Sequence, residues 1–289
     1  MADSGAEQDR VVVVKMMGGL GNQLFQYAFG RQLSSRHQCR LWLDTAWFER
    51  SDERSFVLSQ FKVSADYAET FVWNERPSAR LIRRVRPLRF GSEAPRRIVE
   101  GRHGFDANLL RIRPSCYVEG YVHSYKYLEG LRPALMTEVS IPGEDTKVLD
   151  GYVSVHIRRG DFVSSATEQL VGIEWYSAAI AAMDDAMGPL TPLVFTDDIE
   201  WVAKNLRLPG GRQVEFGSSI RSSPVEDFQY MRRCASHIVS RSTFSWWAAW
   251  CRHDPSGLVI APSGWQYAEV AIDDDIYPPD WTRLSAARV

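Results

Sequence analysis

The sequence contains no segment that could span a membrane and no charge excess that would attract nucleic acid. Apart from four consecutive valines at 11–14 its start is polar, and no stretch approaches the roughly 18 apolar residues of a transmembrane helix. The formal net charge is only −2 and the sequence pI is about 6.3, which excludes a general attraction to nucleic acid or anionic lipid. We expect a globular protein of a bacterial cytoplasm, with peripheral contact at the inner face of the membrane as the alternative.

Cysteine and clustered metal ligands are also scarce. The four cysteines are far apart and form no Cys-x-x-Cys pair, which argues against a zinc site or a redox motif. The histidines outside the motifs described below show no metal-ligand spacing. No Asn-x-Ser/Thr site occurs, in agreement with a chain that does not enter a secretory pathway. We therefore expect reduced thiols and neither a metal nor another cofactor.

The sequence does contain a repeated alternation of strand and helix patterns. In the first half, strands at 11–15 and 41–44 flank a glycine-rich turn and a helix at 24–35, which together form one βαβ unit. A further strand is expected at 116–121, followed by a helix at 124–136. Beyond a Pro-Gly interruption, we expect strands at 153–157, 193–196, 213–216, 238–240 and 258–260, and helices at 174–187, 199–206, 225–234 and 244–251.

This alternation predicts an α/β protein of two domains, residues 1–145 and 146–289. Alternating strands and helices are typical of parallel sheets, so each domain is expected to be Rossmann-like. Residues 76–102 would form an insertion in the first domain, with nine arginines and few acids. A solvated helix or loop is the simplest interpretation of that segment. Contact with acidic lipid headgroups or guidance of an anionic acceptor are the alternatives.

The strand at 153–157 leads into a histidine, two arginines, a glycine and an aspartate. His156, Arg158, Arg159, Gly160 and Asp161 lie at the carboxyl end of a strand, where ligands of α/β proteins bind. Two adjacent guanidinium groups require a nearby anion, because neither can lose its proton. An arginine pair matches phosphate oxygens, and a glycine lets the backbone come close. We interpret the segment as a diphosphate site; the alternative is an ion pair of one arginine with Asp161.

Two acids directly follow the strand at 193–196. One of Asp197 and Asp198 is expected to cap the helix that starts near residue 199. The other is left to accept hydrogen bonds from a ligand. Because one carboxylate can accept from both the N1–H and the exocyclic amine of guanine, the pair suggests a guanine nucleotide.

A glycine-rich turn at 18–23 joins the first strand to the first helix. Its amides and the helix N-terminus favour anions. A dinucleotide-binding fingerprint would need a third glycine where Leu24 stands, so a nucleotide-dependent oxidoreductase is a weak alternative that only Asp44 supports. Asn22 and Gln23 are expected to face a ligand. The apolar residues that follow, at 24–29, fit the helix core at least as well.

In a third motif, residues 240–250, hydroxyl residues precede three tryptophans. Ser242, Thr243 and Ser245 can cap a helix and, together with the amides of its first turn, hold phosphate oxygens without a metal. The tryptophans are expected in the core.

Together these segments resemble the α-1,2-fucosyltransferases of glycosyltransferase family 11. The family signature His-x-Arg-Arg-x-Asp is complete at 156–161, and residues 18–30 match the family's N-terminal motif almost word for word. The resemblance covers both halves of the chain. It implies a GT-B-like fold, in which two Rossmann-like domains face a central cleft. It also implies metal-independent, inverting transfer of L-fucose from GDP-β-L-fucose to the 2-hydroxyl of a terminal galactoside, forming an α-1,2 linkage.

The resemblance further implies roles for single residues. Arg159, assisted by Arg158 and the cap of Ser242 and Thr243, would stabilise the charge that grows on the β-phosphate. His156 would position the donor and Asp161 would orient the arginines. The general base stays open between Asp161, Glu119 and water. Donor-binding residues would be Gly19, Gly21, Asn22, Asp197, Asp198, Ser242, Thr243, Phe244 and Ser245, and acceptor-binding residues would be Gln23, Glu119 and His123.

Two positions depart from the family pattern, and one alternative function remains. Arg241 stands where relatives usually have asparagine, so a further cation would lie beside the diphosphate or point to solvent. His123 stands where glutamine is frequent, which points to a change in acceptor preference. A nucleotide-sugar or glycan-binding protein of the same fold would show binding without turnover. The sequence does not identify the acceptor.

Overall fold

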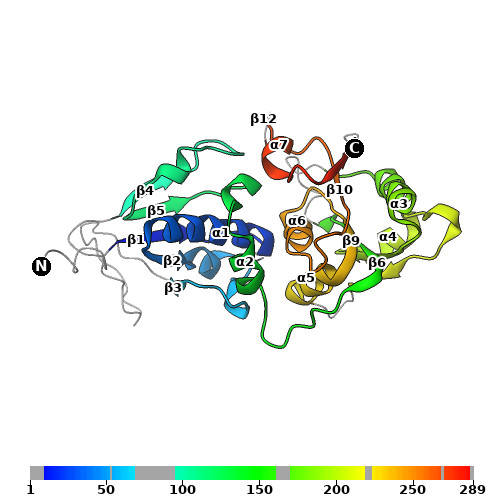
Figure 1. The fold of residues 1–289 in the computed structure, drawn as a ribbon, viewed down its shortest axis with the longest axis horizontal. Helices are drawn as coiled ribbons and strands as arrows, with labels where there is room; N and C mark the ends of the chain where they lie inside the picture. Colours follow the sequence, from blue (N-terminus) through cyan, green and yellow to red (C-terminus); the bar gives the residue numbers. More distant parts are fainter. Residues whose placement is uncertain are drawn as a thin grey trace, which may run out of the picture. The chain divides into compact units, whose positions relative to one another are not determined.

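The chain folds into two compact units, Met1–Ile141 and Pro142–Val289, each built on a parallel β-sheet (Figure 1). The computed structural model describes residues 10–52, 54–68, 95–160, 170–218, 223–267 and 270–286. The predicted α/β class, with two Rossmann-like units as in the GT-B fold, is confirmed.

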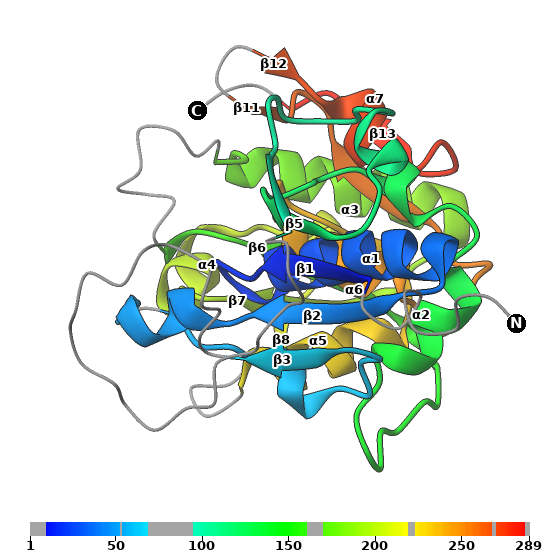
Figure 2. The same ribbon diagram turned by 90° about the vertical axis from the view of Figure 1, so that its left-hand side faces the viewer.

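The first unit is a five-stranded sheet with the strand order β3-β2-β1-β5-β4, every described pair being parallel. Figure 2 shows α1 lying along one face of this sheet. The helix packs closely there, because a side chain at Gly30 would collide with Val14 and Leu41. Its elements are β1 (Val11–Lys15), α1 (Leu20–His37), β2 (Arg40–Asp44), β3 (Asp66–Ala68), β4 (Arg96–Val99), β5 (Cys116–Glu119), the 3₁₀ helix η4 (Tyr125–Leu128) and α2 (Arg132–Glu138).

Two expectations for this unit need correction. The first helix begins at Leu20, four residues before the expected start, because the glycine-rich turn already enters the helix. The helix expected at 124–136 is divided into η4 and α2. Gly130 lies between them with a φ of 77°, a left-handed conformation that ends a helix and that glycine adopts without strain.

The second unit is a six-stranded parallel sheet with the order β13-β10-β9-β6-β7-β8. The expected strands and helices are present except that β9 starts at Cys234, directly after α5, instead of at residue 238. Its elements are β6 (Leu149–Ile157), α3 (Ile173–Met187), β7 (Thr191–Thr196), α4 (Ile199–Asn205), β8 (Glu215–Phe216), α5 (Pro224–Arg233), β9 (Cys234–Ile238), α6 (Thr243–Trp250), β10 (Val259–Pro262), β11 (Gln266–Tyr267), β12 (Val270–Ala271), α7 (Asp273–Ile276) and β13 (Thr282–Leu284).

The two faces of this second sheet differ in polarity. Helices α3 and α4 cover one face, where Val153, Val155 and Ile157 of β6 join the main apolar cluster. The alternate residues of β6 point to the face covered by α5 and α6 (Figure 1). There Ser154 hydrogen-bonds His237 at 2.7 Å. A buried polar layer therefore lies beneath α5 and α6.

The segment that begins the second unit is anchored to it by ion pairs. Glu144 pairs with the fully buried Arg232 at 2.7 Å, and Asp145 pairs with Arg233 at the same distance. His253 also contacts Glu144, at 3.2 Å. Residues 144 and 145 therefore belong structurally to the second unit.

In both units the first strand of the sheet has its next strands on one side, and a later strand lies on its other side. The second unit adds β7 and β8 on one side of β6 and then returns to place β9 on the other side. The first unit adds β2 and β3 beside β1 and places β5 on the opposite side. Such reversals leave a crevice at the carboxyl ends of the strands, where ligands of open α/β sheets bind.

No helix in the described ranges combines the length and the apolar character needed to cross a bilayer.

Candidate active site

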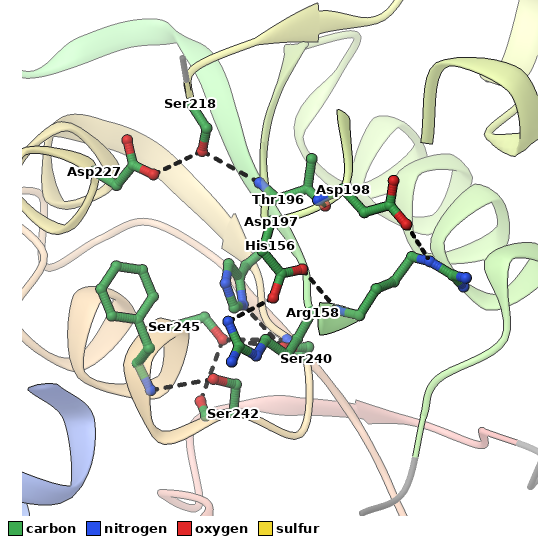
Figure 3. A network of polar contacts seen from close by, with 12 residues as sticks. His156, Arg158, Thr196, Asp197, Asp198, Ser218, Asp227, Ser240, Ser242 and Ser245 are labelled. Carbon is green, nitrogen blue, oxygen red and sulfur yellow. Dashed lines mark hydrogen bonds and ion pairs between the residues drawn. The ribbon is translucent and has the colours of Figure 1, made fainter. Parts of the chain in front are cut away.

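At the reversal point of the second sheet, the end of β6 meets the loop that follows β9. Nδ1 of His156 hydrogen-bonds Oγ of Ser240 at 2.9 Å (Figure 3). The His156 ring also lies 5.3 Å from the ring of Phe244 in α6. The signature histidine is thus held between two segments more than 80 residues away in sequence.

Burial keeps this histidine neutral. His156 is only 5% exposed, and this desolvation, with a smaller effect of the Arg158 charge, lowers the pKa of its imidazole to about 3. A neutral imidazole has one N–H donor and one acceptor nitrogen. His156 can therefore orient a ligand by hydrogen bonding, but it carries no charge at neutral pH.

The arginines are paired with the two acids that follow β7. Nη1 of Arg158 lies 2.5 Å from Oδ2 of Asp197, and Nε of Arg159 lies 3.2 Å from Oδ2 of Asp198. The backbone N–H of Arg159 also donates to Oδ1 of Asp197 at 2.9 Å. Strands β6 and β7 are parallel neighbours with Ile157 opposite Thr196, so the residues that follow each strand meet.

The expectation that one acid caps a helix is confirmed, and the other acid, Asp197, contacts both arginines in this structure. Asp198 is the N-cap of α4 and accepts the N–H of Trp201 at 3.1 Å. Asp197 uses both carboxylate oxygens on Arg158 and Arg159. A carboxylate held by a guanidinium and an amide is poorly suited to recognise guanine as well.

The two arginines point in different directions. Figure 3 shows Arg158 on the side of Ser240 and Ser242, whereas Asp198, the partner of Arg159, lies on the opposite side. The guanidinium carbon of Arg159 lies 3.4 Å from the centre of the Trp201 ring in α4. The charge of Arg158 also acts on His156, which contacts Phe244 of α6, so Arg158 is the arginine on the α6 side of the site.

The carboxylate of Asp197 leaves no room for a side chain at position 160, where the chain has glycine. A Cβ at this position would lie 2.5 Å from Oδ2 of Asp197 and 3.8 Å from Cζ of Arg158. Any side chain at residue 160 would therefore push against the ion pair.

The N-terminus of α6 supplies donors beside Arg158. Ser242 is the N-cap, and its Oγ accepts the N–H of Phe244 at 3.4 Å. Ser245, in contrast, is fully buried and accepts the N–H of Ser240 at 3.3 Å, so it supports the loop from within. Thr243 and Phe244 are partly exposed in the first turn. The tryptophans of this motif lie in the core, as expected, with Trp246 and Trp247 at 0% exposure.

One acid at this edge of the sheet, Asp227, is not part of any motif found in the sequence. Oγ of Ser218 donates to Oδ2 of Asp227 at 2.7 Å and accepts the N–H of Thr196 at 3.2 Å, which ties α5 to the end of β7 (Figure 3). Oδ1 of Asp227 has no hydrogen bond within the described ranges. The available signal was weak, because Asp227 reads as an ordinary acid in the first turn of a helix with a Ser223–Glu226 capping box.

Arg241 does not project to solvent. It is 3% exposed, and its Nη2 donates to the carbonyls of Ser263 at 2.6 Å and Ala286 at 3.3 Å. The expectation that it projects to solvent is wrong, since these contacts tie the loop after β9 to the strands β10 and β13.

In the first unit, the glycine-rich turn joins the reversal point of the sheet. Gly19 caps α1, and Gly21 is buried in its first turn. Oδ1 of Asn22 lies 3.1 Å from Nε2 of His123, so two predicted ligand residues contact one another. Burial lowers the pKa of His123 to about 3, and its ring lies against those of Phe25 and Tyr121.

Gln23 does not face a ligand, contrary to expectation. The side chain is fully buried, and its amide donates to the carbonyls of Gly18 and Ser55 at 3.0 and 2.9 Å. Its Oε1 accepts the N–H of Val57 at 3.0 Å. Gln23 therefore braces the turn. The apolar residues that follow it, from Leu24 to Phe29, lie in the core.

Glu119 is enclosed by cations. Its carboxylate accepts from Nζ of Lys15 at 2.6 Å and from Nη2 of Arg97 at 2.5 Å. These contacts, that of Lys15 foremost, lower the pKa of the carboxyl group. A carboxylate whose pKa is lowered is a weak proton acceptor, so the geometry disfavours Glu119 as a general base.

Two predicted features lie outside the described residues. These are Asp161 of the signature and residues 76–94 of the arginine-rich segment. Within the described ranges, no group of three or more histidine, cysteine, aspartate or glutamate residues is arranged to hold a metal ion.

Comparison with known protein families shows to which family the chain belongs. The sequence profile described as "Glycosyl transferase family 11" matches residues 138–285, just over half of the sequence. The chain belongs to glycosyltransferase family 11. The resemblance inferred from the motifs is thereby confirmed, and the oxidoreductase alternative is set aside.

Two bacterial relatives of this family 11 glycosyltransferase align over most of the chain. Alpha-1,2-colitosyltransferase of Escherichia coli is 28% identical over 296 residues, covering 95% of this chain and 99% of its own. O-antigen biosynthesis glycosyltransferase WbnK of Escherichia coli is 26% identical over 285 residues, covering 86% and 93%. Galactoside alpha-(1,2)-fucosyltransferase 2 of Oryctolagus cuniculus is 29% identical over 103 residues, covering 34% of this chain and 29% of its own.

Among solved structures, NodZ alpha-1,6-fucosyltransferase soaked with GDP-fucose aligns with 84% of this chain and 92% of its own, at 13% identity and a TM-score of 0.42. The family assignment does not depend on this match.

Proposed function

We propose that the protein transfers L-fucose from GDP-β-L-fucose to the 2-hydroxyl of a terminal galactoside and forms an α-1,2 linkage. Family membership supports glycosyl transfer, and the relatives named as α-1,2-fucosyltransferases support the donor and the linkage. The observation that carries the proposal is the ion pair of Arg158 with Asp197, which lies with neutral His156 beside the N-terminus of α6.

Each part of this site suits one part of a nucleoside diphosphate sugar. The guanidinium of Arg158 and the amides at the start of α6 can bind phosphate oxygens, and His156 can donate or accept one hydrogen bond. Asp227 offers the carboxylate oxygen that Asp197 and Asp198 cannot spare, so we assign guanine recognition to Asp227. In this proposal the donor binds to the second unit.

The chemistry requires stabilisation of the leaving group. The bond between C1 of fucose and the β-phosphate oxygen breaks, and its electron pair stays on the phosphate. The acceptor oxygen bonds to C1 from the opposite face and gives its proton to a carboxylate of the site or to water, so the configuration at C1 inverts. In this proposal Arg158 and the α6 amides bind the phosphate on which this negative charge develops, because preorganised donors of this kind lower the barrier most. We therefore expect transfer without an added metal.

A second donor has specific support. The Escherichia coli relative that aligns over 95% of this chain is named as a colitosyltransferase, and colitose is fucose without its 3-hydroxyl. The two sugars share the linkage chemistry at C1, so the residues around the diphosphate do not separate them. GDP-colitose therefore belongs in the same assay as GDP-fucose.

The test is release of GDP from each donor with lactose, N-acetyllactosamine and lacto-N-biose as acceptors, with and without a chelator. The linkage of any product is read by NMR. An α-1,2-fucosyl product in the presence of chelator supports the proposal. Transfer of colitose alone would reject the fucose donor.

Two matched variants show whether this protein, and not a contaminating enzyme, carries out the transfer. Arg158→Ala is expected to remain folded and to lose transfer, while Arg283→Ala, which removes an exposed partner of Asp274, is expected to retain it. If the wild-type protein binds GDP-fucose but transfers to no acceptor, the non-catalytic alternative replaces the proposal. If it binds no GDP at all, the assignment of the site is wrong.

A further inference from the structure

Arg159 is enclosed by residues of α4 on two sides. Its guanidinium carbon lies 3.4 Å from the centre of the Trp201 ring, and its Nε lies 3.2 Å from Oδ2 of Asp198. The side chain of Arg159 is only 18% exposed, whereas that of its partner Asp198 is 37% exposed. A stacked arginine is held more strongly when it is desolvated, because water competes less for its charge.

The same carboxylate also fixes Trp201. Oδ1 of Asp198 accepts the backbone N–H of Trp201 at 3.1 Å, so one acid caps α4 and binds the arginine that stacks on the helix. Trp201 is also partly buried and packs against the apolar cluster that includes Val202 and Leu206. Arg159, Asp198 and Trp201 therefore form one closed set of contacts.

This set determines where Asp197 and Arg158 lie. The backbone N–H of Arg159 donates to Oδ1 of Asp197 at 2.9 Å, and the other oxygen of Asp197 pairs with Arg158. Gly160 leaves room for that carboxylate. A displacement of Arg159 would shift Asp197 and, through it, the guanidinium of Arg158.

We propose that Trp201 is a positioning residue for donor binding. Its ring holds Arg159, and Arg159 in turn holds the Asp197–Arg158 pair in the orientation that binds the diphosphate. This inference rests on the proposed function of the site, because the group that is positioned is the proposed phosphate ligand. In this inference Arg158 contacts the phosphate, and Arg159 keeps the Asp197–Arg158 pair in position.

Two other roles of Trp201 make different predictions. If the indole only fills the core, its loss lowers stability and leaves the affinity of the folded protein for GDP unchanged. If Arg159 itself contacts phosphate, its loss weakens GDP binding whether Trp201 is present or not. A double-mutant cycle of these two residues separates the three cases.

The experiment measures the affinity for GDP by calorimetry in the wild type, Trp201→Leu, Arg159→Met and the double variant. Methionine keeps the unbranched apolar part of the arginine side chain and removes the guanidinium group. We expect Trp201→Leu and Arg159→Met each to weaken GDP binding by about ten-fold, and the double variant to be no weaker than Arg159→Met alone. If the double variant loses GDP affinity by the product of the two single losses, the proposal is overturned. It is also overturned if folded Trp201→Leu binds GDP as tightly as the wild type.

Two further variants guard against loss of folding. Trp201→Phe keeps an aromatic face and is expected to bind GDP within about three-fold of the wild type. Trp175→Leu removes another tryptophan that packs against the same apolar cluster from α3, and it is expected to lower the melting temperature without a change in GDP affinity. Loss of GDP affinity in Trp175→Leu equal to that in Trp201→Leu would show a general effect of core damage and reject the proposal.

The wild-type measurement keeps the two proposals apart. If the wild type does not bind GDP, the proposed function fails and the positioning role fails with it. If the wild type binds GDP and Arg158→Ala weakens binding while Trp201→Leu does not, the proposed function stands and only the role of Trp201 is rejected.

Discussion

Asp197 joins the two signature arginines through different atoms: its Oδ2 lies 2.5 Å from Nη1 of Arg158, while its Oδ1 accepts the backbone N–H of Arg159 at 2.9 Å. The side chain of Arg158 and the main chain of Arg159 are therefore oriented by one carboxylate. This arrangement separates two residues that a sequence motif presents as equivalent. It also leads to the first prediction.

Removal of the two arginines should have unequal effects. We expect Arg158→Ala to lower kcat by roughly 10²–10³-fold, because a preorganised donor at the leaving group is lost. Arg159→Lys should lower kcat less, since lysine keeps the charge but not the stacking or the planar guanidinium. Steady-state kinetics of folded variants with GDP-fucose measures both. A larger loss in Arg159→Lys than in Arg158→Ala would contradict the geometry.

Asp227 should determine the preference for guanine. A carboxylate can accept from both N1–H and the exocyclic amine of guanine, whereas hypoxanthine lacks that amine. Hydrogen bonds to charged groups contribute about 1.5–3 kcal/mol, so the wild type should bind GDP more tightly than IDP by about ten-fold or more.

Asp227→Asn should remove most of this preference, as measured by calorimetry with both nucleotides. Glu200→Gln, which changes an exposed acid in the first turn of α4, serves as the control. An undiminished preference in Asp227→Asn would show that the base is recognised elsewhere.

Gly160→Ala should damage the site without damaging the fold. The new methyl group would lie 2.5 Å from Oδ2 of Asp197 and force the carboxylate away from Arg158. We expect kcat to fall by about ten-fold or more while the melting temperature stays near that of the wild type. Gly151→Ala, in the strand β6 that precedes Gly160 and with nothing within 4 Å of the added carbon, is the matched control. Equal activities of the two variants would contradict this prediction.

Three buried histidines should make the protein less stable in mild acid. Burial lowers the pKa values of His123, His156 and His237 to about 3, whereas the ordinary value in an unfolded chain is about 6.5. Between these values the unfolded chain binds more protons than the folded one. The free energy of unfolding therefore falls as the pH decreases from about 6.5 toward 3, by up to about 1.4 kcal/mol per pH unit for each histidine.

His237→Gln isolates one of these contributions. Urea unfolding between pH 4 and 7 measures how the free energy of unfolding changes with pH. The slope should correspond to about one proton fewer taken up on unfolding than in the wild type. Because His156 stays neutral over this range, its titration should not appear in the pH profile of kcat/KM near 6.5. An unchanged slope in His237→Gln would show that this histidine is not held neutral by the fold.

The buried ion pair at the start of the second unit should matter for stability. Glu144 is 4% exposed and Arg232 is fully buried, so Glu144→Ala leaves a guanidinium uncompensated in the core. We expect the free energy of unfolding to fall by about 3–5 kcal/mol. Asp274→Ala, which removes the exposed partner of Arg283, should change it by no more than about 1 kcal/mol. Equal effects of the two variants in urea unfolding would contradict the prediction.

Much of the fold could be predicted from local sequence because the signals are local. The valines of β1, the apolar run of β6 and the Asp198 cap of α4 are each read within a few residues. Errors occurred where an element is fixed by its neighbours instead. Strand β9 starts at Cys234 because it pairs with β6 there, with Leu149 opposite Cys234, although its own sequence continues a helical pattern.

The candidate site was predicted less completely. The residue types at 156–160 and 240–245 indicated phosphate chemistry, and they do meet in space. Gln23 was misjudged because a polar residue in a glycine-rich turn suggests exposure, whereas here it satisfies three backbone groups. Asp227 was missed because its importance comes from Ser218, which lies on another segment.

The sequence by itself determined the family, the two α/β units and the residue types of a phosphate site, because strand and helix patterns and short motifs depend on neighbouring residues. Only the tertiary structure decided which arginine lies near α6, which acid is already occupied and which acid has an oxygen to spare. Those answers depend on strand order: the return of β9 beside β6 brings Ser240 to His156, and the pairing of β6 with β7 brings Asp197 to Arg158. Hydrogen bonds and ion pairs act over about 3 Å, so their partners are set by this packing and not by separation along the chain.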